Sequence, residues 1–152
     1  MSTKLSLASL ILAVTAMAAP VRWPHGRTTQ DYEEQAVRKP LEQYILAHAT
    51  GKAEYILQAF SSDAKVQFVH DGKLTQFTRD EFAARFSGKP EADEAQRVRR
   101  IASVEVTGNA ARATIVLEYP KVTLTDYMSL LKIDGEWKIV NKIFNAQPKP
   151  AS

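Results

Sequence analysis

The second half of the chain carries the feature that most limits the fold, a series of four segments rich in β-branched residues. The segments are 97–107, 110–119, 122–133 and 136–145, with Gly108-Asn109 between the first two and Asp134-Gly135 between the last two. β-branched residues favour strands, and Gly, Asn and Asp accept the positive φ angles of tight hairpin turns. The pattern predicts four strands joined as an antiparallel meander.

The first half alternates between helical and strand patterns. Asp31 with Glu34 three residues later predicts a helix start, and apolar positions then follow one helical face as far as Gly51, a helix-ending residue. A short second helix is expected over 53–60.

A hairpin and a third helix follow. Residues 65–70 and 74–77 flank the turn dipeptide Asp71-Gly72. Thr78 with Glu81 forms a capping box that opens the helix, and 88–90 (GKP) ends it. Because the helices precede the meander instead of alternating with its strands, the sequence predicts an α+β fold with the helices on one face of a sheet.

The chain ends suggest an exported protein. Residues 1–18 have the positive start, short apolar run and small residues before Ala19 that are typical of a cleaved signal peptide. We expect a flexible leader over 19–30, one domain over 31–146 and a frayed tail over 147–152, located in the periplasm or secreted. There are no cysteines, so no disulfide can form.

Charge and histidine spacing exclude some partners. The formal net charge is +3, without a long basic run, which argues against nucleic acid. The basic cluster at 97–100 is interrupted by Val98 and is expected at a strand edge. His25, His48 and His70 lack the spacing of metal ligands, so the sequence indicates neither a metal site nor a cofactor.

Three motifs carry a family resemblance. They are Tyr44-Ile45 ahead of Gly51, the segment 60–64 (FSSDA) and the segment 134–140 (DGEWKIV). Together with the element order they resemble the nuclear transport factor 2-like superfamily over about 31–146, and residues 126–135 (DYMSLLKIDG) resemble its putative lumazine-binding branch, near the SnoaL-like proteins. The resemblance implies a cone-shaped fold with a curved antiparallel sheet wrapped around three helices, and a homodimer formed across the sheet.

Comparison with the ketosteroid isomerases of this superfamily implies catalytic candidates. Tyr44 falls at the oxyanion-binding tyrosine and Asp126 at or within one residue of the oxyanion-hole acid, whereas Phe68 stands where the carboxylate base is expected. His70, two residues along the same strand, could replace that base because imidazole titrates near neutrality. Each has a structural alternative: Tyr44 as a core aromatic, Asp126 as a solvent-facing partner of Lys142, and His70 as a surface residue.

The leading hypothesis is a pocket that binds a small cyclic organic molecule, since pockets are mostly apolar and aromatic with a few polar groups. Lumazine is one candidate ligand. The expected ligand-binding residues are Tyr44, Phe60, Phe68, Phe82, Tyr119, Asp126 and Asn141, with His70 as a further polar contact. The rival hypothesis is an isomerase, cyclase or hydrolase with Asp126 or His70 as base and Tyr44 as oxyanion donor, and a third is a protein-interaction module that docks through the outer sheet face.

Overall fold

The computed structural model describes residues 28–150. The predicted signal peptide, all but the last three residues of the predicted leader, and residues 151–152 lie outside the described residues. The elements follow one another as α1 (Thr29–Thr50), α2 (Ala53–Ala59), β1 (Phe60–His70), β2 (Lys73–Thr78), α3 (Arg79–Ala83), a 3-10 turn (Glu94–Gln96), β3 (Val98–Thr107), β4 (Ala110–Glu118), β5 (Val122–Ile133) and β6 (Glu136–Pro148). The predicted α+β class is confirmed.

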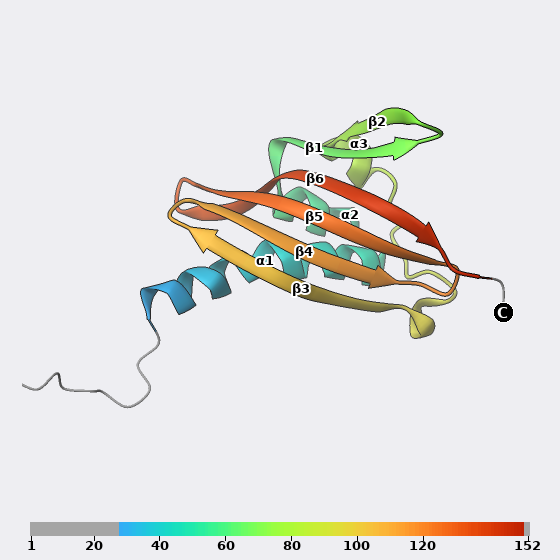
Figure 1. Ribbon diagram of the computed structural model, residues 1–152, viewed down its shortest axis with the longest axis horizontal. Helices are drawn as coiled ribbons and strands as arrows, with labels where there is room; N and C mark the ends of the chain where they lie inside the picture. The colour runs from blue at the N-terminus through green and yellow to red at the C-terminus, as the bar shows by residue number, and fades with distance from the viewer. Residues whose placement is uncertain (1–27, 151–152) are drawn as a thin grey trace, which may run out of the picture.

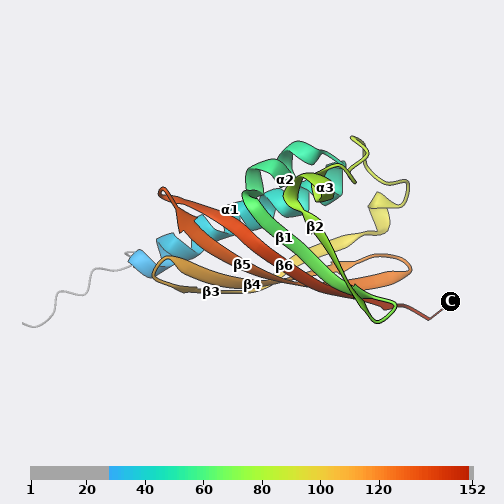
Figure 2. The same ribbon diagram turned by 90° about the horizontal axis from the view of Figure 1, so that it is seen from above.

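The strands form one curved sheet of six, in the order β2-β1-β6-β5-β4-β3 (Figure 1). The β1–β2 hairpin and the β3–β6 meander meet where β1 pairs with β6, and this pair is parallel while every other pair is antiparallel. All three helices lie on the same face of the sheet (Figure 2). We call this the inner face and the opposite one the outer face.

Helix α1 begins earlier than the sequence pattern predicted. The prediction that Asp31 caps it is wrong, because Thr28 is the N-cap and Asp31 is the third helical residue of the capping box. The Thr28 hydroxyl accepts from the Asp31 amide at 3.2 Å, and the Asp31 carboxylate accepts from the Thr28 amide at 2.8 Å. An acidic residue three positions after a threonine satisfies the capping box as well as Glu34 after Asp31 would.

Three other boundaries differ from the predicted ones. Strand β1 starts at Phe60, five residues before the predicted start at Lys65, with a bulge between Phe60 and Lys65 that breaks the alternating pattern. Helix α3 is only five residues long. Strand β6 continues to Pro148, which pairs with Val122, so the sheet extends two residues beyond the predicted domain end at 146.

The core lies between α1 and the inner face of the sheet. It contains Trp137 and Ile139 together with buried side chains from both helical and strand elements. Its largest fully buried apolar members are Tyr44, Phe60, Leu41, Ile56, Ile115, Leu117, Met128, Leu130 and Ile139. Within residues 28–150, no helix combines the length and apolar character needed to cross a membrane.

Candidate functional site

Three polar side chains meet inside the core and form what we call the buried cluster, Tyr44, Asp126 and Lys142. The Tyr44 hydroxyl donates to Asp126 Oδ2 at 2.6 Å, and Lys142 Nζ lies 3.2 Å from Asp126 Oδ1. Tyr44 and Asp126 are completely enclosed and Lys142 is 2% exposed. Charged groups are almost never buried this fully unless they are paired, so the pairing explains how the core accepts them.

The register of two adjacent strands brings the charges together. Asp126 on β5 faces Phe144 across the ladder, and Lys142 is two residues along β6 from Phe144. Side chains two apart share a sheet face, so both charges point inward, beneath the Tyr44 side chain from α1. Asp126 therefore pairs with Lys142, as the alternative reading expected, but in the core and not in solvent.

Aromatic rings enclose the lysine. Lys142 Nζ lies 4.1 Å from the centroid of the Phe144 ring and 5.3 Å from those of Tyr44 and Phe82. Ammonium groups are attracted to ring faces at these distances, more strongly where water is absent. The ammonium is thus held by one carboxylate and three rings.

Burial dominates the electrostatics of the cluster. It lowers the pKa of the Lys142 ammonium, an effect that the Asp126 charge opposes. It also raises the pKa of the Tyr44 hydroxyl well above its usual value, with the negative charge of Asp126 adding to the effect. Tyr44 is therefore a protonated hydrogen-bond donor over the whole physiological range.

A second polar chain runs beside the cluster and joins α1 to β3 and the end of β4. His48 Nδ1 lies 3.2 Å from the Tyr119 hydroxyl, and Arg99 Nε donates to that hydroxyl at 3.4 Å. Arg99 also forms a two-pronged ion pair with Glu94, at 2.5 and 2.7 Å, and donates to the His48 carbonyl at 3.2 Å. The predicted basic cluster at 97–100 thus directs Arg99 to the inner face instead of to an external polyanion.

His48 links this chain to the buried cluster. Its ring packs edge-on against Tyr44 with centroids 4.7 Å apart, and its Nε2 is buried without a hydrogen-bond partner among residues 28–150. Burial, followed by the nearby positive charges of Lys142 and Arg99, lowers the His48 pKa well below its usual value. Because Tyr119 accepts from Arg99, its own proton is free for Nδ1, which assigns the remaining imidazole proton to Nε2.

The His48 ring also lines a hollow of about 200 Å3, which we call the His48 hollow. Two of its lining residues, His48 and Phe82, touch members of the buried cluster. The lining consists of His48, Gly51, Phe82, Arg85, Phe86, Ser87, Lys89, Glu91 and Arg97.

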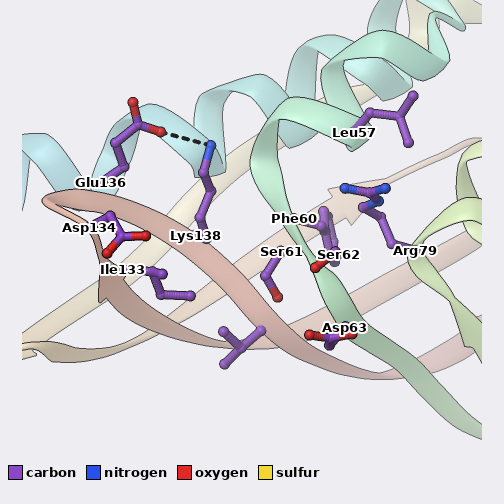
Figure 3. A pocket seen from close by; sticks show the side chains of 11 residues that line it. Leu57, Phe60, Ser61, Ser62, Asp63, Arg79, Ile133, Asp134, Glu136 and Lys138 are labelled. Carbon is purple, nitrogen blue, oxygen red and sulfur yellow. Dashed lines mark ion pairs between the residues drawn. The ribbon is translucent and has the colours of Figure 1, made fainter.

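Further hollows lie outside the core. A side groove of about 670 Å3 runs between the end of α2, the bulged start of β1 and the β5–β6 hairpin, where Lys138 pairs with Glu136 at 3.1 Å (Figure 3). An outer-face hollow of about 350 Å3 is lined by exposed apolar side chains such as Val69, Leu74 and Ile143.

The structure brings only some of the predicted site residues together. Tyr44 and Asp126 are in direct contact, and the Phe60 ring centroid lies 6.1 Å from that of Tyr44. Tyr119 contacts His48, and Phe82 contacts Lys142, so both adjoin the cluster. Phe68 stacks on Phe144 with centroids 4.6 Å apart.

Two predicted residues lie elsewhere. The His70 side chain is 72% exposed at the β1–β2 turn, with Asp71 3.5 Å away, so it does not join the cluster. Asn141 lines an outer-face hollow with Tyr127 and Ser129, because it alternates with the inward-pointing Lys142.

Sequence reasoning missed two important members. Lys142 was considered only as a partner of Asp126 in solvent. His48 was placed on the apolar face of the first helix and rejected as a metal ligand, but it was not named as a site residue. A helical spacing of four residues places His48 on the same face of α1 as Tyr44, which is the signal that could have found it. No comparable signal exists for Lys142, because its inward direction depends on the register of β6.

The arrangement supplies a neutral phenol donor, a carboxylate, a desolvated amine and a neutral imidazole within one region. Such groups can orient a polar ligand or transfer a proton. Within the part of the chain that the structure describes, no group of three or more His, Asp or Glu side chains could hold a metal ion.

Comparison with solved structures identifies the fold. The chain is similar to a nuclear transport factor 2-like protein of unknown function from Shewanella baltica, at 28% identity and a TM-score of 0.72, over 81% of this chain and 100% of that one. A second such protein, from Silicibacter pomeroyi, is 23% identical with a TM-score of 0.69, over 79% of this chain and all of that one.

Comparison with curated proteins adds one that is named as an aldolase. The chain is 23% identical over 106 residues to the aldolase FrzH of Cladobotryum sp., covering 70% of this chain and 85% of that protein. The family model described as putative lumazine-binding matches residues 32–145. This match extends from α1 to the end of the sheet, so the chain belongs to the putative lumazine-binding family of the nuclear transport factor 2-like superfamily.

Proposed function

We propose that this protein binds a small cyclic organic molecule in the His48 hollow, with the buried cluster and its aromatic rings forming the inner wall of the site. The observation that carries the proposal is the convergence of Tyr44, Asp126 and Lys142 beneath His48 and Phe82, which line that hollow. A buried ion pair is weak evidence for stability, since apolar residues often replace one without loss. A role in ligand binding would explain why this chain keeps a buried ion pair that stability alone does not require.

The chemistry of the wall suits a flat ligand. Phe86 makes edge-to-face contacts with two other rings of the wall, with centroids 5.1 Å from His48 and 5.5 Å from Phe82. Pockets are usually lined by aromatic and apolar side chains with a few polar groups that fix orientation. The family name and the fold support a small-molecule ligand of this kind.

Native mass spectrometry of the protein purified from its own host tests the proposal, because a bound molecule appears as a defined added mass. Three exposed serines allow one hollow to be filled at a time: Ser87 beside the His48 hollow, Ser62 in the side groove and Ser129 on the outer face. Ser87→Trp is expected to remove the added mass, while Ser62→Trp and Ser129→Trp keep it. Loss only in Ser62→Trp or Ser129→Trp would overturn the proposed location.

A second candidate function is proton transfer on a carbonyl compound. It is favoured by the direct contact between the Asp126 carboxylate and the Tyr44 hydroxyl, a base and a proton donor side by side, and by the similarity to a protein named as an aldolase. In this scheme the Asp126 carboxylate takes a proton from the carbon next to a carbonyl, and the released electron pair forms an enolate. Tyr44 turns its hydroxyl proton from Asp126 to the enolate oxygen.

Exchange of ketone α-protons for deuterium tests this second candidate. Cyclohexanone in heavy water, followed by proton NMR, is expected to lose its α-proton signal faster with the wild-type protein than without it. Tyr44→Phe should slow the exchange at least about tenfold, the usual order for loss of one acid–base group being 10²–10⁴. Arg112→Gln, on the outer face, is the control that should exchange normally. Equal exchange with Tyr44→Phe and wild type would exclude this chemistry.

We also propose that the protein is exported, with residues 1–18 removed as a signal peptide. The support is the sequence pattern of that segment. Intact-mass measurement of the protein from a periplasmic or medium fraction should give a chain that starts at Ala19. A cytoplasmic protein that retains residues 1–18 would contradict export.

A further inference from the structure

We propose that the His48 hollow binds the carboxylate group of a small monocyclic acid. The inference rests on the proposed function and goes beyond it by assigning the charge and size of the ligand. Its basis is the charged and polar groups around the hollow, the volume of the hollow, and the backbone contact that holds the 87–91 segment against the end of α1.

The rim of the hollow has an excess of positive charge. Arg85, Lys89 and Arg97 line it together with a single acid, Glu91. Arg97 is already bound to Asp93 at 2.7 Å, and its guanidinium lies 4.2 Å over the Tyr119 ring. Arg85 and Lys89 have no ion pair among residues 28–150, although Arg85 lies 4.8 Å over the Phe77 ring. Two cations are therefore left for a ligand.

The imidazole of His48 supplies a neutral donor. With Nδ1 engaged by Tyr119, Nε2 carries the proton and lacks an acceptor among residues 28–150. A buried donor without an acceptor is costly, by roughly 1–3 kcal/mol, and an anionic oxygen is the strongest acceptor that could relieve it. A carboxylate has two oxygens, so one can face Nε2 while the other faces the rim cations.

The walls limit the size of the ligand. The hollow measures about 200 Å3, below the roughly 300–1,000 Å3 of pockets for drug-sized ligands. Two of its walls are the Phe82 and Phe86 rings, whose planes are at 90° to one another. One flat ring with a short acidic group fits these limits, whereas a nucleotide or a multi-ring ligand exceeds them.

The position of Lys89 is set by the backbone. The Gly88 amide donates to the Gly51 carbonyl at 2.7 Å, so the 87–91 segment is attached to the end of α1. A Cβ on Gly51 would lie only 2.0 Å from the Lys89 carbonyl oxygen, which shows how closely the two segments approach. The hollow is therefore a formed site with a cation on a fixed wall.

Benzoate and benzamide are a matched pair of probes, since they share one ring and differ in charge. Calorimetric titration of the wild-type protein is expected to show benzoate binding about tenfold more tightly than benzamide, a difference of about 1.4 kcal/mol. Charge-assisted hydrogen bonds are roughly twice as strong as neutral ones, which gives this order of preference. Ser87→Trp should abolish binding of both.

Two double variants with equal loss of charge test the role of the rim. Arg85→Gln with Lys89→Gln should reduce the preference for benzoate to near one, while Lys121→Gln with Arg112→Gln, neither of which lines the hollow, should preserve it. An unchanged preference in the first variant, or no preference in the wild type, would overturn the inference. If both probes bind equally and Ser87→Trp abolishes them, the acid assignment fails and the proposed site stands. If Ser87→Trp leaves binding unchanged, the proposed site fails as well.

Discussion

Lys142 and Asp126 illustrate how much a single pair of residues shapes this interior. Desolvating two charges costs several kcal/mol per ion, and only their mutual attraction, the Tyr44 hydrogen bond and the surrounding rings offset that cost. Removing either side chain alone should therefore destabilise the fold, because the other would remain buried without its partner. Nε2 of His48 remains without a hydrogen-bond partner among residues 28–150, so one polar group beside the pair is still available to a ligand.

A double-mutant cycle on this pair gives the first prediction. Lys142→Met and Asp126→Asn should each lower the free energy of unfolding by about 3–5 kcal/mol, because each leaves the other member buried without its partner. The double variant should lose clearly less than the sum. Urea denaturation measures all four proteins, and strictly additive losses would mean that the two side chains do not interact.

The His48 imidazole gives a second prediction, on pH. Burial lowers its pKa in the folded state below 6.5, so between pH 6.5 and that lowered value the unfolded chain binds one proton more than the folded one. Stability therefore falls as the pH falls through this range, by at most about 1.4 kcal/mol per pH unit.

Urea denaturation at pH 7.0, 6.0 and 5.0 measures this slope. His48→Phe should flatten it, whereas His70→Gln, at an exposed position, should leave it unchanged. A steep slope that persists in His48→Phe would show that other groups cause the acid sensitivity.

At the level of elements, the end of α1 and the segment after α3 determine the position of the residues that line the His48 hollow. Gly51 ends α1 with φ of 69°, and its carbonyl holds Gly88 of the segment after α3. α3 itself is a single capped turn. The short connection therefore depends on α1 for its position, since a five-residue helix has little stability of its own.

Gly51→Ala tests this dependence as a third prediction. Alanine at positive φ is strained, and here its Cβ would also collide with the Lys89 carbonyl. We expect a loss of about 2 kcal/mol or more in the free energy of unfolding, with faster amide hydrogen exchange over 85–91. Gly72→Ala is the matched control, because Gly72 has φ of 73° but open space around its Cβ, and it should cost about 1 kcal/mol. Equal losses would rule out the close approach as the cause.

The elements also show what could be predicted from the sequence. The turn dipeptides and the β-branched runs located the hairpins and the meander, because local backbone preferences decide them. Asp71 and Asp134 indeed adopt φ of 48° and 50°. The early start of β1 could not be predicted, since the bulge after Phe60 removes the alternation, and the parallel β1–β6 pair joins residues about 80 positions apart.

The candidate site was predictable only in part for the same reason. Tyr44 and Asp126 could be named through the family resemblance. The pairing of Asp126 with a buried Lys142 could not, because a shift of one residue in the register of β6 would send Lys142 outward and Asn141 inward. That direction is set by the bulge at Val140, where Ser129 faces Asn141 and the next residue, Leu130, faces Ile139.

In the molecule as a whole, helices cover one face of the sheet and leave the other face exposed. The helices cover the inner face, while the outer face presents Val69 and Leu74, each 70% exposed, with Tyr127 at 53% and Ile143 at 47%. These four side chains line one outer-face hollow, so they form a continuous apolar patch. Patches of this kind mark interaction surfaces.

A homodimer formed through this patch is the fourth prediction. Ile143→Glu should shift the sedimentation coefficient from a dimer to a monomer, because the charge would be buried against an apolar partner. Leu46→Glu, at an exposed position of α1, is the control that should leave the dimer intact. A monomeric wild-type protein, or a dimer in both variants, would contradict dimerisation through this face.

Mapping the residues that a ligand contacts is the most direct test of whether the binding site is the His48 hollow or a hollow elsewhere on the molecule. Methyl and amide NMR spectra of the protein, recorded while a small-molecule extract of its host is added, should show shifts centred on His48, Phe82 and Met128, around the buried cluster. Shifts confined to Tyr127 and Ile143 on the outer face, or to Ser62 in the side groove, would contradict a ligand site built on Tyr44, Asp126 and Lys142.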